Sequence, residues 1–133
     1  MATLFDKLQL KDHPEMLVLN APESFEIELS RLPVLHVHRA IESLAEIRFS
    51  LAFVTKQAEV DALASKIAAR AKGDPTIWFA YPKGSSKKYK CDFNRDTGWA
   101  ALQAAGFDTV RAIAIDKDWT GLRFRRREFI KSR

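Results

Sequence analysis

The strongest constraint on the fold is an alternation along the chain between short apolar runs and segments with helical periodicity. Short apolar runs bounded by turn residues are typical of buried strands, and apolar residues spaced three or four apart are typical of helices. Strands are therefore predicted at residues 16–19, 34–38, 49–54, 76–81, 110–115 and 122–126. The last two flank a polar turn at 116–121 and are predicted to form an antiparallel hairpin.

Helices are predicted between most of these strands. The clearest is 55–72, which carries an apolar stripe, with Thr55 as its N-cap and Lys72-Gly73-Asp74-Pro75 as its stop signal. Others are expected at 22–32, at 41–47 as one or two turns, and from Asn94 or Asp96 to Ala105. The first 14 residues are expected to hold either one helical turn or an edge segment.

Strands that alternate with helices pair in parallel, because each helix carries the chain back across the sheet. The pattern predicts a three-layer α/β sandwich with a mostly parallel sheet and a C-terminal antiparallel hairpin. With 133 residues, the chain is expected to form a single domain covering 1–133. Phe53, Trp78 and Phe79 are predicted core residues on the central strands. The single cysteine excludes an intramolecular disulfide framework.

The positive charge is concentrated in the second part of the chain. The formal charge is +5, yet residues 1–82 carry 9 basic and 11 acidic side chains, whereas residues 83–133 carry 13 basic and 6 acidic ones. Most of the excess lies in 83–90 and 123–133. These clusters indicate either anion binding or a solvated loop with a basic tail. We find neither a signal-peptide pattern nor an apolar stretch long enough to span a membrane, so a cytoplasmic location without membrane contact is expected.

The order of the predicted elements resembles the Rossmann-like fold of S-adenosylmethionine-dependent methyltransferases. A hairpin after the last helix is the distinguishing feature of that fold. Residues 17–25 (LVLNAPESF), 78–86 (WFAYPKGSS) and 114–125 (AIDKDWTGLRFR) resemble an uncharacterised bacterial family, the DUF3052-type proteins. The resemblance covers nearly the whole chain and implies the Rossmann-like fold. Because that family has no assigned activity, the resemblance leaves the function open.

Ligands of parallel α/β sheets bind outside the carboxyl ends of the strands. The loops to search begin at Asn20, Thr55 and Pro82, with Asp116 beside the hairpin. A nucleotide cofactor needs glycines in the first loop, but this loop begins with Asn20 and the first glycine of the chain is Gly73. No adenosyl or dinucleotide cofactor is therefore expected. Asn20 is a candidate ligand contact, and helix entry is the alternative interpretation.

The loop after residue 82 is the strongest candidate anion site. Lys83, Ser85, Ser86 and Lys87 offer ammonium and hydroxyl groups directly after a strand. Arg95 is a candidate to join Lys83 around a phosphate or carboxylate. The alternatives are a mobile, lysine-rich surface loop and an Arg95 that pairs with a neighbouring acid while Asn94 or Asp96 caps a helix.

The hairpin turn supplies the remaining candidates. Asp116 and Asp118 are spaced to bind a hard cation, although local hydrogen bonds of a turn are the favoured explanation. Trp119 either covers a ligand or folds over the core. His36 and His38 share a strand face but lack a recognisable third ligand, so no metal site is predicted.

Cys91 is the remaining nucleophile of interest. Lys88 and Lys90 are near it in sequence, and such charges can lower the pKa of a thiol, but Cys91 is interpreted as incidental. No histidine stands at a catalytic spacing from it, and no G-x-S-x-G elbow is present, so no catalytic residue is predicted.

Three functions are compatible with these observations. The first is a non-enzymatic binding or interaction module on a methyltransferase-like scaffold, with a small anionic ligand at the Lys83 loop. The second is a diverged S-adenosylmethionine-dependent methyltransferase. The third, less favoured, is a weak single-stranded nucleic-acid binder that uses 83–90 and the arginine-rich end. Self-association through the edge of the terminal hairpin is a further hypothesis.

Overall fold

The computed structural model describes residues 4–10, 15–31, 36–93 and 98–130. Its helices are α1 (Leu4–Lys7), α2 (Glu23–Leu29), α3 (Gln57–Arg70) and α4 (Ala100–Ala104), with short 3-10 turns η1 (Ile41–Ser43) and η2 (Arg127–Phe129). Its strands are β1 (Glu15–Leu19), β2 (His36–His38), β3 (Ile47–Phe53), β4 (Ala71–Pro82), β5 (Phe107–Ala114) and β6 (Trp119–Arg126). Among the described helices, none combines the length and the apolar character needed to cross a membrane.

A single six-stranded sheet in the order β2-β1-β3-β4-β6-β5 organises the fold. β1 to β4 pair in parallel, and β6 pairs antiparallel with both β4 and β5. The predicted α/β fold, mostly parallel with a C-terminal antiparallel hairpin, is confirmed. The initial segment contains one helical turn, as one of the two sequence interpretations expected.

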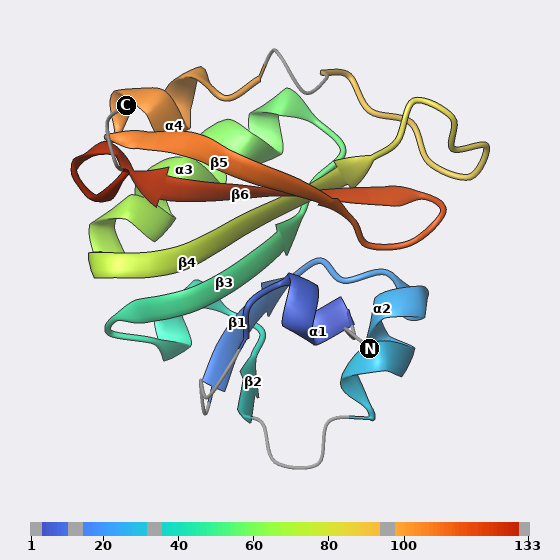
Figure 1. Ribbon diagram of the computed structural model, residues 1–133, viewed down its shortest axis with the longest axis horizontal. Coiled ribbons are helices and arrows are strands. Elements are labelled where there is room, and N and C mark those ends of the chain that lie inside the picture. Colours follow the sequence, from blue (N-terminus) through green and yellow to red (C-terminus); the bar gives the residue numbers. More distant parts are fainter. Residues whose placement is uncertain (1–3, 11–14, 32–35, 94–97, 131–133) are drawn as a thin grey trace.

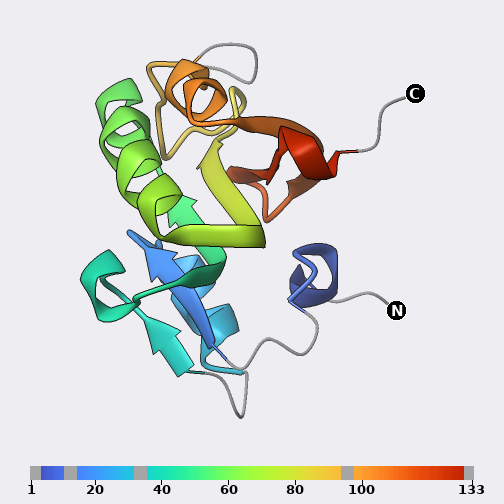
Figure 2. The same cartoon turned by 90° about the vertical axis from the view of Figure 1, so that its left-hand side faces the viewer.

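Helices cover both faces of the sheet (Figures 1 and 2). On the face of α3 and α4, Val60, Ile67 and Leu102 pack with Phe79 and Phe124 of the sheet. On the opposite face, the side chains of α2 and of the α1 segment pack with alternate residues of the same strands. This second cluster includes Leu8, Phe25, Leu29, Val18, Leu51, Phe53 and Trp78. The three predicted core residues are buried, with Trp78 and Phe79 at 0% exposure.

The N-terminus of α3 differs from the prediction. Thr55 is not its N-cap; the helix begins after Lys56, and the Glu59 carboxylate accepts hydrogen bonds from the backbone N–H groups of Thr55 and Lys56 at 2.8 and 3.1 Å. The N–H of Gln57 donates to Asp92 Oδ1 at 2.7 Å. A carboxylate from a distant loop therefore satisfies a free donor of the first turn.

The end of α3 also differs. The helix ends at Arg70, and β4 starts at Ala71 without a loop, so the predicted stop signal at 72–75 lies inside the long strand β4. The pairing of β3 with β4 is irregular there, since Ile47 pairs with Ala71 and Phe49 already pairs with Thr76. Gly73 has a φ of 67°, which a residue without a Cβ adopts without strain.

Candidate functional site

The carboxyl ends of β1, β3 and β4 lie at one edge of the sheet, as parallel pairing requires. Asn20 Nδ2 donates to the carbonyl of Phe53 at 3.5 Å, and the N–H of Val54 donates to the carbonyl of Ala80 at 2.8 Å. The N–H of Lys83 donates to the carbonyl of Asp118 at 2.8 Å. The four loop starts selected from the sequence therefore belong to one region of the structure.

Asn20 makes the turn out of β1 in the left-handed region, with a φ of 58°. Asparagine tolerates this conformation better than most residues. Its side chain is exposed and points its amide toward β3. Asn20 thus takes the backbone position at which a nucleotide-binding loop would carry a glycine.

The crevice of this fold is expected between β1 and β3, because the chain leaves β1 toward β2 and returns to β3 on its other side. Phe53, the last residue of β3, is 2% exposed. Its ring packs against Phe25 of α2 and Trp119 of β6, both at 5.1 Å between centroids. Above them Ser24 Oγ donates to Asp116 Oδ2 at 3.0 Å. The three rings thus fill the end of β3, while Ser24, Phe25 and Asp116 line a hollow of about 300 Å³ beside them.

The hairpin turn is built by its two aspartates. Asp116 Oδ1 accepts the N–H groups of Asp118 and Trp119 at 2.8 and 3.0 Å, the local hydrogen bonding of the turn interpretation. Asp118 Oδ1 accepts the Ser86 hydroxyl at 2.9 Å. The Ser86 oxygen in turn accepts the N–H of Tyr89 at 3.1 Å. The turn therefore fixes the loop that follows β4.

The same loop is anchored at its far end to α3. Besides Asp92, whose carboxylate caps Gln57, the carbonyl of Gly98 accepts the Gln57 side-chain amide at 2.7 Å. The N–H of Asp92 donates to the carbonyl of Thr55 at 3.1 Å. These contacts hold both ends of the loop on the edge of the sheet.

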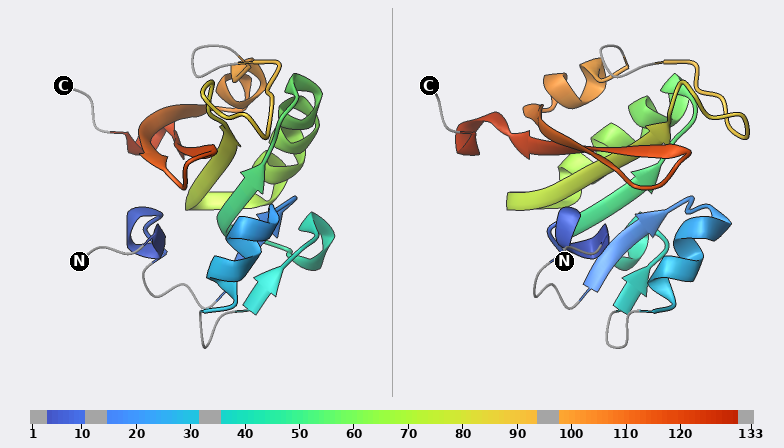
Figure 3. Two further views of the ribbon diagram at one scale, coloured as in Figure 1. Left: turned by 90° about the vertical axis from the view of Figure 1, so that its right-hand side faces the viewer. Right: turned by 45° about the vertical axis from the view of Figure 1, so that its right-hand side comes forward.

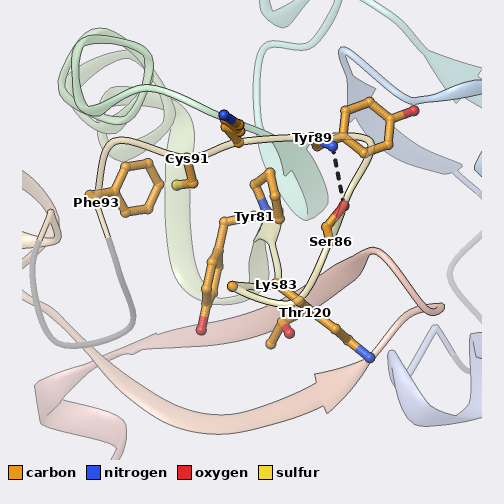
Figure 4. A pocket seen from close by; sticks show the side chains of 10 residues that line it. Tyr81, Lys83, Ser86, Tyr89, Cys91, Phe93 and Thr120 are labelled. Atoms are coloured by element: carbon orange, nitrogen blue, oxygen red, sulfur yellow. Dashed lines mark hydrogen bonds between the residues drawn. The ribbon is translucent and has the colours of Figure 1, made fainter.

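The loop encloses a cavity of about 590 Å³ at the end of β4. Figure 4 shows Tyr81, Cys91 and Phe93 grouped on one side, with Ser86 on the other and Lys83 extending past Thr120. Lys90 also contributes to the wall. The cavity combines a wall of aromatic rings with two lysine side chains, which suits a ligand that has an apolar and an anionic part.

A second, smaller hollow of about 310 Å³ lies between this loop and the hairpin turn. It is lined by Ser85, Lys87, Lys88, Lys117 and Asp118. The candidate residues of the loop are therefore divided: Lys83 and Ser86 line the larger cavity, whereas Ser85 and Lys87 line the hollow. Arg95 lies outside the described residues, and so do Asn94 and Asp96, the proposed caps.

The lysines near Cys91 in sequence do not lower the pKa of its thiol. Burial of the thiol, more than any other influence, raises its pKa above the ordinary value, and the nearby carboxylates of Asp92 and Glu59 act in the same direction. The lysines that are adjacent in sequence do not offset this effect. The thiol is therefore protonated at neutral pH and is a poor nucleophile.

The two histidines of β2 share one face, as predicted, with rings stacked at 4.3 Å. His38 is bonded on both nitrogens, to Glu15 Oε1 at 2.8 Å and to Ser43 Oγ at 3.0 Å. Within the described part of the chain, no group of three or more histidine, cysteine, aspartate or glutamate side chains is placed to hold a metal ion.

Sequence reasoning did not select Thr120 or Lys90 for the cavity, or Ser24 for the crevice. Thr120 reaches the cavity because it pairs with Tyr81 in the β4–β6 ladder. That register joins strands far apart in sequence, so no local pattern reveals it. Ser24 lies in the first turn of the helix predicted at 22–32. Asp116, which accepts its hydroxyl, is 92 residues away in the sequence.

Comparison with solved structures shows the same fold in methyltransferases. A SAM-dependent methyltransferase from Aquifex aeolicus superposes with a TM-score of 0.61 at 12% identity, over 92% of this chain and 87% of that chain. The ribosomal protein L11 methylase from Lactobacillus delbrueckii subsp. bulgaricus gives 0.56 at 10% identity, over 92% and 76%. Magnesium protoporphyrin IX methyltransferase from Synechocystis, with bound SAM, gives 0.54 at 11% identity, over 92% and 74%.

The scaffold is methyltransferase-like. No protein-family profile and no curated protein matches the chain. The resemblance to the DUF3052-type family therefore stays a prediction. At these identities the structural likeness concerns the fold, and the function depends on the residues of the site.

Proposed function

We propose that the chain is a non-enzymatic binding module on a methyltransferase-like scaffold, and that its ligand is a small aromatic anion held in the cavity after β4. One observation carries the proposal: the rings of Phe25, Phe53 and Trp119 pack together at the switch point, beside an open cavity with two lysines. In this proposal the ligand lies at the end of β4 and not in the crevice between β1 and β3.

The packed rings argue against an adenosyl cofactor at the switch point. Phe25, Phe53 and Trp119 are 1%, 2% and 3% exposed, so a ligand at this place would have to displace core side chains. Exposing one such side chain to water costs about 1.5–3 kcal/mol. The loop after β1 also presents the Asn20 side chain where close backbone approach would need glycine.

The cavity after β4 offers the opposite chemistry. Tyr81 and Phe93 lie 6.0 Å apart between ring centroids and form an apolar wall. Lys83 and Lys90 provide positive charge at the same cavity. An aromatic carboxylate would place its ring against this wall and its charge near the ammonium groups. The attraction between these opposite charges becomes stronger as water is excluded from the cavity.

Isothermal titration calorimetry with benzoate and indole-3-acetate, compared with neutral benzamide, tests the proposal. The anions should bind and the amide should not. Lys83→Met and Lys90→Met should each weaken binding about tenfold, the effect of one charge-assisted hydrogen bond. Lys117→Met, which removes a charge from the neighbouring hollow, is the matched control and should bind normally. Equal affinity for benzamide, or equal loss in the control, would refute the site.

A diverged S-adenosylmethionine-dependent methyltransferase is the second candidate, favoured by the fold of the neighbouring structures. It requires the cofactor to enter beside Phe53. Micromolar affinity for S-adenosylmethionine would support this candidate and count against a module whose ligand lies at β4.

A further inference from the structure

Two arginines face each other across the C-terminal hairpin. Arg111 of β5 and Arg123 of β6 are directly paired in the antiparallel ladder, so their side chains leave the same face of the sheet. Paired residues of this kind have their Cβ atoms about 4.5–5.5 Å apart, and like charges directly opposite destabilise the ladder. The hairpin therefore carries a like-charge repulsion at a position where an apolar pair or two opposite charges would be more stable.

This face is partly covered by the segment that follows α1. Trp78, the β4 neighbour of Arg123, donates its Nε1–H to the carbonyl of Leu8 at 2.9 Å, and Arg123 Nη1 donates to the side-chain oxygen of Gln9. Within the described part of the chain this cover leaves Arg111 exposed on the edge strand β5. Figures 1 and 3 show α1 on the side of the sheet opposite α3.

The charges around the pair are unbalanced. Asp74 is held by Arg125, which donates Nε to Oδ1 at 3.0 Å and Nη2 to Oδ2 at 2.6 Å. Among the described residues, Arg123 donates a side-chain hydrogen bond to the neutral oxygen of Gln9 and to no carboxylate. Its Nε is buried without an acceptor in the described structure. Arg111 makes no ion pair within the described residues.

The pKa of Arg123 reflects this environment. Burial lowers it first, the charge of Arg125 lowers it further, Asp74 raises it, and Arg111 lowers it again. The guanidinium group of Arg123 therefore lies where an additional anion would be stabilised. A buried donor without an acceptor is also a place where a bound ion or water is expected.

We propose that Arg111 and Arg123 bind a phosphate group on the open face of the β5–β6 hairpin, at a site separate from the cavity after β4. Guanidinium groups bind phosphate oxygens in a bidentate manner, and Gln9 already orients one of them. A bound dianion would convert the repulsion between the two cations into attraction for a common partner. The phosphate can belong to a small phosphate compound or to the backbone of a single-stranded nucleic acid.

Titration calorimetry with inorganic phosphate and with a short oligodeoxythymidylate tests this site. Arg111→Ala should weaken the binding of phosphate about tenfold, whereas Arg48→Ala, which removes an exposed arginine of β3, should not. Binding of phosphate alone indicates a small ligand, and Arg111-dependent binding of both indicates a nucleic-acid backbone. Equal affinity in wild type and Arg111→Ala, or no binding of either probe, overturns the proposal.

Thermal unfolding supplies a second readout that does not depend on the identity of the ligand. In phosphate-free buffer Arg111→Ala should unfold at a higher temperature than wild type, because one member of the repulsive pair is removed. Added phosphate should raise the wild-type midpoint and leave that of Arg111→Ala nearly unchanged. A lower midpoint of Arg111→Ala in phosphate-free buffer contradicts the repulsion on which the site rests.

Discussion

The hydroxyl of Ser24 donates to Oδ2 of Asp116 at 3.0 Å and joins the first turn of α2 to the turn of the C-terminal hairpin. Beneath this contact Phe53 is enclosed between Phe25 and Trp119. The two elements thus meet across the end of β3, at the place where ligands enter this type of sheet. The cavity of about 590 Å³ lies farther along, after β4, and Ser24, Phe25 and Asp116 line a smaller hollow of about 300 Å³.

Asp116 is predicted to contribute to stability more than its position on the surface indicates. Asp116→Ala removes the acceptor of two backbone N–H groups and of the Ser24 hydroxyl, and should lower the free energy of unfolding by about 1–2 kcal/mol. Urea unfolding measures this difference. Lys117→Ala in the same turn is the control, and an equal loss there would contradict the role of the carboxylate.

Trp78 and Trp119 are both buried, so a comparison of the two measures the contribution of one hydrogen bond. Trp78 Nε1 donates to the carbonyl of Leu8, whereas Trp119 Nε1 is buried without an acceptor in the described structure. Trp78→Phe should therefore lower the free energy of unfolding by about 2–3 kcal/mol, and Trp119→Phe by about 1 kcal/mol less. Denaturant unfolding of both variants measures this difference in the free energy of unfolding. A larger loss in Trp119→Phe would show that the hydrogen bond to Leu8 contributes little.

The alternating pattern was sufficient to predict the succession of strands and helices along the chain, because each element reflects local periodicity. The apolar positions of 55–72 include Val60, Ala64 and Ile67, which α3 buries against the sheet. The run at 49–54 likewise overlaps β3 and brings Phe53 to the end of that strand. These features depend on neighbours within one or two turns of the chain.

The site was predictable only in part, because it depends on contacts between distant segments. The position of Lys83 follows from the end of a strand, which the sequence indicates. The cap that Asp92 provides for Gln57 spans 35 residues, and the pairing of Tyr81 with Thr120 depends on the register of β4 with β6. Neither leaves a signal in local spacing.

Gly98 is predicted to be essential for the shape of the cavity wall. Its φ is 93°, and an added Cβ would lie 2.8 Å from both the Phe93 ring and Gln57 Oε1. Gly98→Ala should lower the free energy of unfolding by at least about 1 kcal/mol and weaken ligand binding by displacing Phe93. Gly84→Ala is the control, since its Cβ would meet nothing within 4 Å. If both variants unfold at the same urea concentration, the close approach at Gly98 is unimportant.

The pair of Asp74 with Arg125 predicts a dependence of stability on acid pH. The hydrogen bond from Arg125 lowers the pKa of Asp74 below its ordinary value of 3.8, against the opposing effect of burial. A carboxyl whose pKa is lower in the folded state contributes stability above its unfolded pKa, and this contribution is lost as the pH falls through the folded pKa.

Wild type should therefore lose stability as the pH falls below about 4, and Asp74→Asn should lose less over the same range. Chemical denaturation between pH 5 and pH 2, at constant ionic strength, measures the two slopes. Arg125→Gln should reduce the slope in the same way, because it removes the partner that lowers the pKa. Identical slopes in wild type and both variants would mean that this ion pair does not couple folding to protonation.

The proposed function requires that the ligand binds after β4 and not in the crevice between β1 and β3. Isothermal titration calorimetry of the wild-type chain with S-adenosylmethionine and S-adenosylhomocysteine tests it most directly, with benzoate as the comparison ligand. We expect no heat of binding from either adenosyl compound under conditions in which benzoate binds. Saturable binding of S-adenosylmethionine at micromolar concentration, with or without benzoate, would contradict the claim.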